Sequence, residues 1–167
     1  MIKRVYGGAF AITVYDPAKR TWGRLPPIDD PDFDGIEAWF QCVAVNRKLV
    51  LIGGFSIFNM TLTKSVYIYD FESARWSRGA DMLTARSFFA CCVSSSTGLV
   101  YVAGGNVEGS NSLVAAEAYS VEEDKWEILP PMIQPHGLGC DGVFMEGKFM
   151  VFTEDISVEV FEPSAGT

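Results

Sequence analysis

The sequence predicts an all-β protein built from repeated antiparallel sheets, and three observations support this fold class. An aromatic residue is followed seven positions later by a tryptophan three times along the chain. The three pairs are Tyr15 with Trp22, Tyr69 with Trp76, and Tyr119 with Trp126. Segments such as VYIYD and ISVEVF alternate in polarity and are rich in β-branched and aromatic residues, which is typical of strands. No segment shows the sustained 3.6-residue periodicity of an amphipathic helix.

The spacing of the repeats indicates the architecture. The tryptophans lie 54 and 50 residues apart (76 − 22 and 126 − 76). A period near 50 residues is that of the kelch-type β-propeller, in which each repeat forms one four-stranded antiparallel blade. Two glycine pairs recur with the same period, each after an apolar run, and we expect them to adopt backbone angles that a side chain disfavours. These pairs are Gly53 with Gly54 and Gly104 with Gly105.

The repeats divide the chain into blades. We expect a single kelch-repeat domain over 1–167, with a partial first blade over 9–26, complete blades over 39–80 and 86–130, and a degenerate partial last blade over 136–163. In the last blade Phe161 takes the tyrosine position and no tryptophan follows. The total is about three blades, whereas propellers close with typically four to eight. We therefore expect either a fragment of a longer product or covered ends, and an isolated chain that self-associates through open strand edges.

The repeated aromatic residues and the cysteines are assigned to structure. Each tyrosine and tryptophan offers a large ring with one polar tip, which suits a seam between blades. Phe161 and the glycine pairs belong to the same structural set. The four cysteines fall in the first strands of blades, where we expect them to be buried free thiols of a reducing compartment rather than a disulfide framework. They are Cys42, Cys91, Cys92 and Cys140.

Charge and hydropathy exclude several classes of protein. The net charge is −8 and the basic residues are scattered, which disfavours nucleic-acid binding. No apolar run approaches the roughly 18 residues of a membrane span. The apolar start VYGGAFAITVY follows Lys3-Arg4 like a short signal peptide, but AITVYDP already aligns with a repeat strand. We therefore expect a cytoplasmic and/or nuclear protein, in which the sequon at Asn59 is not glycosylated.

Candidates for metal binding and catalysis are weak. A histidine-based metal centre needs two or three imidazoles, and the chain has one histidine, His136. The acidic segment from Asp29 to Gly35 matches the first positions of a calcium loop, but the twelfth position is Gln41 rather than a bidentate glutamate. No paired nucleophile and base stand out, so we expect no metal, no cofactor and no enzymatic activity.

Several strings of the sequence resemble plant F-box/kelch-repeat proteins. The most specific are WSRGADM with RSFFACC, and LVYVAGGN, and the resemblance extends over about residues 9–163. It implies a propeller that holds a protein destined for ubiquitination while an F-box recruits an SCF ubiquitin ligase. Relatives of this subgroup are associated with the turnover of phenylpropanoid-pathway enzymes and hormone-response regulators. The chain departs from the pattern because nothing before residue 9 can form an F-box, and because the last blade lacks its Gly-Gly and its tryptophan.

The predicted binding surface is one rim of the propeller. Loops after the second strands and loops between blades open on the same side, because strands alternate in direction within a blade. We expect Arg86 to be the main contact, since a guanidinium grips carboxylates and arginine is common in interface hot spots. The alternative is that Arg86 ties blades together through backbone carbonyls. His136 likewise either contacts a partner or caps a strand end. The other expected contacts are Trp39, Ser56, Phe58, Asn59, Ser87, Asn106, Glu108, Asn111 and Gln134.

Two function classes follow from the sequence. The favoured one is the substrate-recognition module of an SCF-type ubiquitin ligase, reached through an F-box outside this chain. The alternative is a kelch scaffold that binds cytoskeletal or signalling partners without a ligase role.

Overall fold

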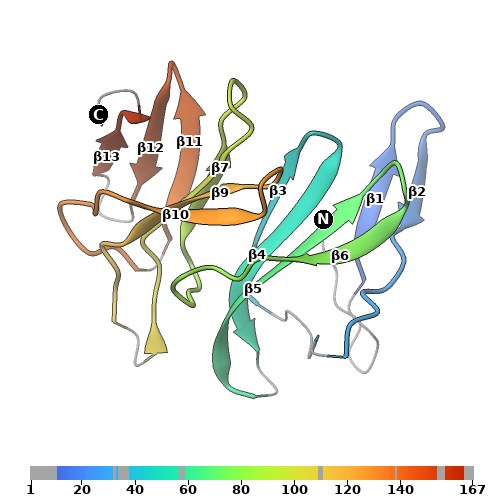
Figure 1. Ribbon diagram of the computed structural model, residues 1–167, viewed down its shortest axis with the longest axis horizontal. Coiled ribbons are helices and arrows are strands. Elements are labelled where there is room, and N and C mark those ends of the chain that lie inside the picture. The colour runs from blue at the N-terminus through green and yellow to red at the C-terminus, as the bar shows by residue number, and fades with distance from the viewer. Residues whose placement is uncertain are drawn as a thin grey trace.

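The computed structural model describes residues 11–31, 33, 38–56, 59–108, 111–137, 139–153 and 157–163. These residues form thirteen strands in four antiparallel sheets and contain no α-helix (Figure 1). The prediction of an all-β fold that makes up part of a kelch-type propeller is confirmed. Among the described residues, no helix is long and apolar enough to cross a membrane.

Each sheet occupies one of the ranges expected to form a blade, and we number the sheets as blades in chain order. The first blade has two strands, β1 (Thr13–Asp16) and β2 (Thr21–Arg24). The second has four in the order of the chain, β3 (Gln41–Val45), β4 (Lys48–Ser56), β5 (Thr61–Asp70) and β6 (Arg75–Gly79). The third also has four, β7 (Ala90–Val93), β8 (Val100–Ala103), β9 (Ala116–Ser120) and β10 (Lys125–Leu129). The fourth has three, β11 (Asp141–Met145), β12 (Lys148–Phe152) and β13 (Val158–Phe161).

The seven-residue spacing of the aromatic pairs is a hairpin register. In each of the first three blades the tyrosine lies directly opposite the tryptophan on the next strand, and their ring centroids are 4.8–5.1 Å apart. The turn between them brings two large rings together on one face of the sheet, where such a cross-strand pair stabilises the hairpin. In the fourth blade Phe161 lies opposite Phe149 on β12.

Blades pack against one another through apolar seams. The first strands of successive blades are neighbours, with β3 beside β7 and β7 beside β11. One buried cluster joins the second and third blades and includes Ile52, Val66, Phe89 and Tyr119. A second cluster joins the third and fourth blades. A single blade cannot bury its faces alone, so these seams supply the hydrophobic core.

The two ends of the sheets differ. Turns between first and second strands, and between third and fourth strands, lie at one end, which we call the turn end (upper side of Figure 1). The β4–β5 hairpin extends toward the other end, because these strands have 9 and 10 residues. We call that end the loop rim, and its described residues are 38–40, 53–56, 59–63, 86–89, 104–108, 111–115 and 133–137.

The prediction for the cysteines is partly wrong. Cys91 and Cys92 lie in β7 and are buried, and Cys140 is buried immediately before β11, but Cys42 on β3 is exposed. All four are free thiols. Burial, followed by the nearby carboxylate of Asp141, raises the pKa of Cys92 to about 12, so this thiol stays protonated.

Candidate functional site

The glycine pairs let adjacent blades come into close contact at the loop rim. Gly53 has φ 58° and Gly104 has φ 66°, and a Cβ at either position would lie within 3 Å of the carbonyl oxygen of Arg86 or His136 respectively. The next residue of each pair donates its N–H to the same carbonyl, at 3.0 Å for Gly54 and 2.8 Å for Gly105. Only glycine combines this backbone angle with such a close approach.

A chain of backbone hydrogen bonds runs along the loop rim from the second blade to the fourth. It connects Trp39 to Phe88, Ser87 to Asn106 in both directions, and Leu113 to the entry loop of the fourth blade. The distances between N and O lie between 2.8 and 3.4 Å. These hydrogen bonds connect the described parts of the rim loops to one another.

Trp39 is the main exposed aromatic side chain of the loop rim. It is 48% exposed, its ring stacks on Phe88 with centroids 4.4 Å apart, and Phe55 lies 5.7 Å away. Trp39 and Phe88 occupy equivalent positions before the first strands of their blades, and both have positive φ, 56° and 58°. Bulky residues rarely adopt this conformation, which costs about 1–3 kcal/mol and is concentrated at functional sites.

The interpretation of Arg86 as the main partner contact is wrong, because its side chain is completely buried. Nη1 donates to the carbonyls of Gly104 and Ala115, both at 2.9 Å, and Nη2 pairs with Glu117 at 2.5 Å. The other Glu117 oxygen accepts the N–H of Leu83 at 2.9 Å. Burial lowers the pKa of Arg86, and the Glu117 charge opposes that shift. The alternative expectation, that Arg86 ties blades together, describes this contact.

His136 occupies the equivalent position in the next repeat and makes a similar contact. Its Nε2 lies 3.0 Å from Glu159, whose carboxylate also accepts the N–H groups of Ile133 at 2.6 Å and Gln134 at 3.1 Å. Burial raises the pKa of Glu159, but the two N–H groups and His136 outweigh it, and the net shift is downward. His136 is therefore the capping histidine of the alternative expectation, and Gln134 leaves its side chain exposed.

Two residues of these contacts were missed from the sequence. Glu117 and Glu159 each stand two positions before the aromatic residue of the repeat, Tyr119 or Phe161. A carboxylate that recurs at a fixed place in a strand of apolar residues was the available signal. Each glutamate fastens the loop that enters its blade, so we call Glu117 with Arg86, and Glu159 with His136, the two latches.

The remaining predicted contacts have mixed environments. Asn106 is half-buried, Glu108 is exposed, and Asn59 and Asn111 are exposed. Two of the serines are not surface residues, because Ser56 is 2% and Ser87 is 3% exposed. Their hydroxyls lie under the rim rather than on it. Phe58 lies outside the described residues.

The tryptophans form the seams that the sequence predicted, with one exception. Trp126 donates its indole N–H to the carbonyl of Ala80 at 2.8 Å, and Trp76 donates to that of Pro26 at 2.7 Å. Each acceptor lies four residues after the tryptophan of the preceding repeat. In the first blade Trp22 is 62% exposed and Tyr15 is 46% exposed, so this pair does not have the buried environment of the others.

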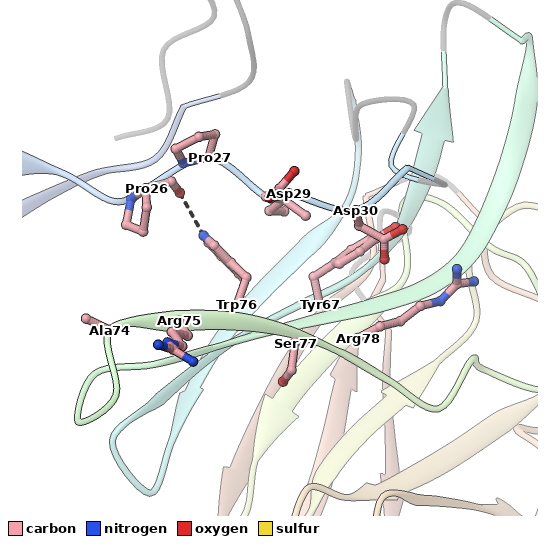
Figure 2. Close-up of a pocket in the computed structure, with 11 residues that line it drawn as sticks. Pro26, Pro27, Asp29, Asp30, Tyr67, Ala74, Arg75, Trp76, Ser77 and Arg78 are labelled. Carbon is pink, nitrogen blue, oxygen red and sulfur yellow. Dashed lines mark hydrogen bonds between the residues drawn. The ribbon is translucent and has the colours of Figure 1, made fainter.

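A pocket of about 450 Å³ lies at the seam between the first and second blades. In Figure 2 Trp76 reaches up to the Pro26 carbonyl, while Tyr67 and Arg78 lie on the side of Asp30. The seam between the second and third blades is closed at the equivalent positions by Glu117 and by Asp124, which accepts the N–H of Ala80 at 2.6 Å and the hydroxyl of Tyr119. Tyr67 and Ala74 stand in their places and line the pocket. The lining consists of Pro26, Pro27, Ile28, Asp29, Asp30, Tyr67, Ala74, Arg75, Trp76, Ser77 and Arg78.

The described residues offer no cluster of three or more histidine, cysteine, aspartate or glutamate side chains that could hold a metal ion. Three positions of the calcium-like segment, Asp32, Asp34 and Gly35, lie outside the described residues.

Comparison with known proteins identifies the repeats. The family model for the kelch motif matches residues 40–83 and 86–133, which together make up more than half of the chain. The chain belongs to the kelch-repeat family. This kelch chain is similar to three Arabidopsis thaliana proteins: F-box/kelch-repeat protein At2g44130 (39% identity over 75% of the chain), SKIP20 (37% over 75%) and F-box/kelch-repeat protein At1g16250 (36% over 89%). It spans 30%, 30% and 42% of their respective lengths, less than half in each case.

Proposed function

We propose that this chain is the substrate-holding part of an SCF-type ubiquitin ligase receptor, which binds a protein at the loop rim for ubiquitination and turnover. The observation that carries the proposal is a rim of hydrogen-bonded loops with an exposed, stacked tryptophan, Trp39. Hot spots of protein interfaces are enriched in aromatic anchors set in well-packed surroundings. The likeness to F-box/kelch-repeat proteins supplies the ligase context, and a cytoplasmic and/or nuclear location is part of the proposal.

The test uses the full-length gene product that contains this chain. It should co-purify with the SCF adaptor, and the level of its bound protein should rise when the proteasome is inhibited. Bound protein without adaptor would instead support the scaffold that anchors cytoskeletal or signalling partners.

The contribution of the rim is tested in the same experiment. Trp39→Ala should reduce the amount of captured protein while leaving the adaptor bound. Ile128→Ala is the matched control, because Ile128 is 75% exposed on β10, outside the loop rim. Equal capture by both variants and the wild type would exclude Trp39 from the binding surface.

A further inference from the structure

The loop rim carries an aromatic cluster of Trp39, Phe55 and Phe88, in which the half-exposed Trp39 ring stacks on Phe88. Trp39 stacks on Phe88, and Phe55 packs beside it, so the indole cannot turn into the core without losing both contacts. Its backbone is fixed by the bond from the Phe88 N–H to the Trp39 carbonyl and by the neighbouring bond from Phe55 to Ala38. The exposed indole is therefore already held in one orientation before a partner binds, which reduces the conformational entropy lost on binding.

Basic side chains are concentrated at the turn end of the blades, where carboxylates such as Asp70 and Glu123 accompany them, and they are rare in the described loop rim. Of the described lysines and arginines, seven lie at or beside the turns of the turn end: Lys19, Arg20, Arg47, Lys48, Arg75, Lys125 and Lys148. Within the described loop rim the one arginine, Arg86, is buried and paired, whereas Glu108 is exposed. Lys64, at the shoulder of the rim, lies 3.9 Å from Asp81, which also pairs with Arg78 at 3.1 Å.

The exposed Trp39 indole and the charge of the loop rim together favour a partner of one charge. An indole attracts a cation placed over its face, and the strength of the contact grows as water is excluded. In the described part of the loop rim Glu108 is the exposed charged side chain, and the chain has a net charge of −8, so the rim attracts basic segments and repels acidic ones. We propose that the loop rim binds a basic segment of the partner protein, and that an arginine or lysine side chain of this segment stacks on Trp39. This inference names the partner chemistry of the site under the proposed function and rests on it.

The test is a titration of the 15N-labelled 167-residue chain, followed by its indole N–H signals in NMR. The probes are three capped pentapeptides, Gly-X-Gly-X-Gly with X arginine, glutamate or leucine. The chain has four tryptophans, and the indoles of Trp76 and Trp126 are hydrogen-bonded in seams, so they serve as internal controls. Trp39→Phe assigns the Trp39 signal and keeps an aromatic ring in its place.

The arginine peptide should shift the Trp39 signal in a saturable manner, with apparent affinity that falls at least threefold when salt is raised from 50 to 300 mM, because exposed charges are then screened. Trp39→Ala should weaken binding roughly three- to tenfold, the range of a partly exposed cation–π contact. Ile128→Ala, outside the loop rim, should bind like the wild type.

Three outcomes would overturn the inference: equal shifts with the glutamate or leucine peptide, a shift confined to the other indoles, or no shift at all. Each of these leaves the proposed function standing if the full-length product still captures the SCF adaptor and a protein substrate. Loss of adaptor capture with intact arginine binding would remove the ligase role and keep the basic-segment site.

Discussion

The seams on the two sides of the second blade occupy the same place in the repeat but are closed differently. Between the second and third blades, Asp124 and Glu117 accept backbone N–H groups of the preceding loop. Between the first and second blades, Ala74 and Tyr67 stand in those positions and a pocket opens. The preceding loop also differs, because Pro26 replaces Ala80 and has no N–H to satisfy. The absence of a carboxylate at Ala74 therefore leaves no donor unpaired at that point.

This difference separates two kinds of interaction. The tryptophan hydrogen bond recurs in both seams, at 2.7 and 2.8 Å, and sets the distance between blades. The carboxylates vary from seam to seam with the loop whose N–H groups they accept. The spacing of the blades thus follows from the repeated tryptophan, whereas the polar contacts across each seam depend on the two blades that meet there.

The largest expected effect on stability comes from comparing the buried Trp126 with the exposed Trp22. Trp126→Ala should destabilise the chain by about 3–5 kcal/mol, because the ring is 7% exposed, stacks on Tyr119 and holds Ala80. Trp22→Ala should cost less than about 1 kcal/mol, since most of its surface is already in water. Urea denaturation measures both. Equal losses of unfolding free energy in the two variants would mean that Trp22 is packed against another part of the protein.

A similarly large effect is expected at the buried latch. Glu117→Gln should cost about 3–5 kcal/mol, because it leaves the Arg86 charge buried without a counter-ion. Replacing both residues together, with Glu117→Leu and Arg86→Met, should restore much of the loss, because no uncompensated charge then remains. The unfolding free energies of the single and double variants form the test. A double variant as unstable as Glu117→Gln would show that packing, not charge, dominates the latch.

The sequence predicted the repeat better than the site. The Tyr–Trp spacing and the glycine pairs are local patterns, and each has a local cause in hairpin register or backbone angle. The pairing of Arg86 with Glu117 was not predicted, because Glu117 lies 31 residues along the chain, in a strand that only the packing of two blades brings near. The positive φ of Trp39 was not predicted either, because tryptophan rarely adopts this backbone conformation.

A smaller effect distinguishes the two seams directly. Asp124→Ala should cost about 1–3 kcal/mol, because the Ala80 N–H and the Tyr119 hydroxyl lose their acceptor. The reverse change in the other seam, Ala74→Asp, should alter stability by less than about 0.5 kcal/mol. Ala74 has φ 54°, which aspartate tolerates, but Pro26 offers it no N–H. Thermal melting compares the two variants. A clear gain from Ala74→Asp would mean that the carboxylate finds another donor in the pocket.

The smallest effect separates the two latches by pH. Glu159→Gln should cost about 1 kcal/mol at pH 7, since this carboxylate is near the surface and a neutral amide still accepts hydrogen bonds. The pKa of Glu159 is lowered in the folded chain, so its contribution is complete above the unfolded value near 4.3 and is lost as the pH falls through the folded pKa. The difference between wild type and Glu159→Gln should therefore shrink between about pH 5 and pH 3. A difference that stays constant over this range would show that the Glu159 charge adds nothing to the hold on Ile133 and Gln134, and that shape alone fastens the loop.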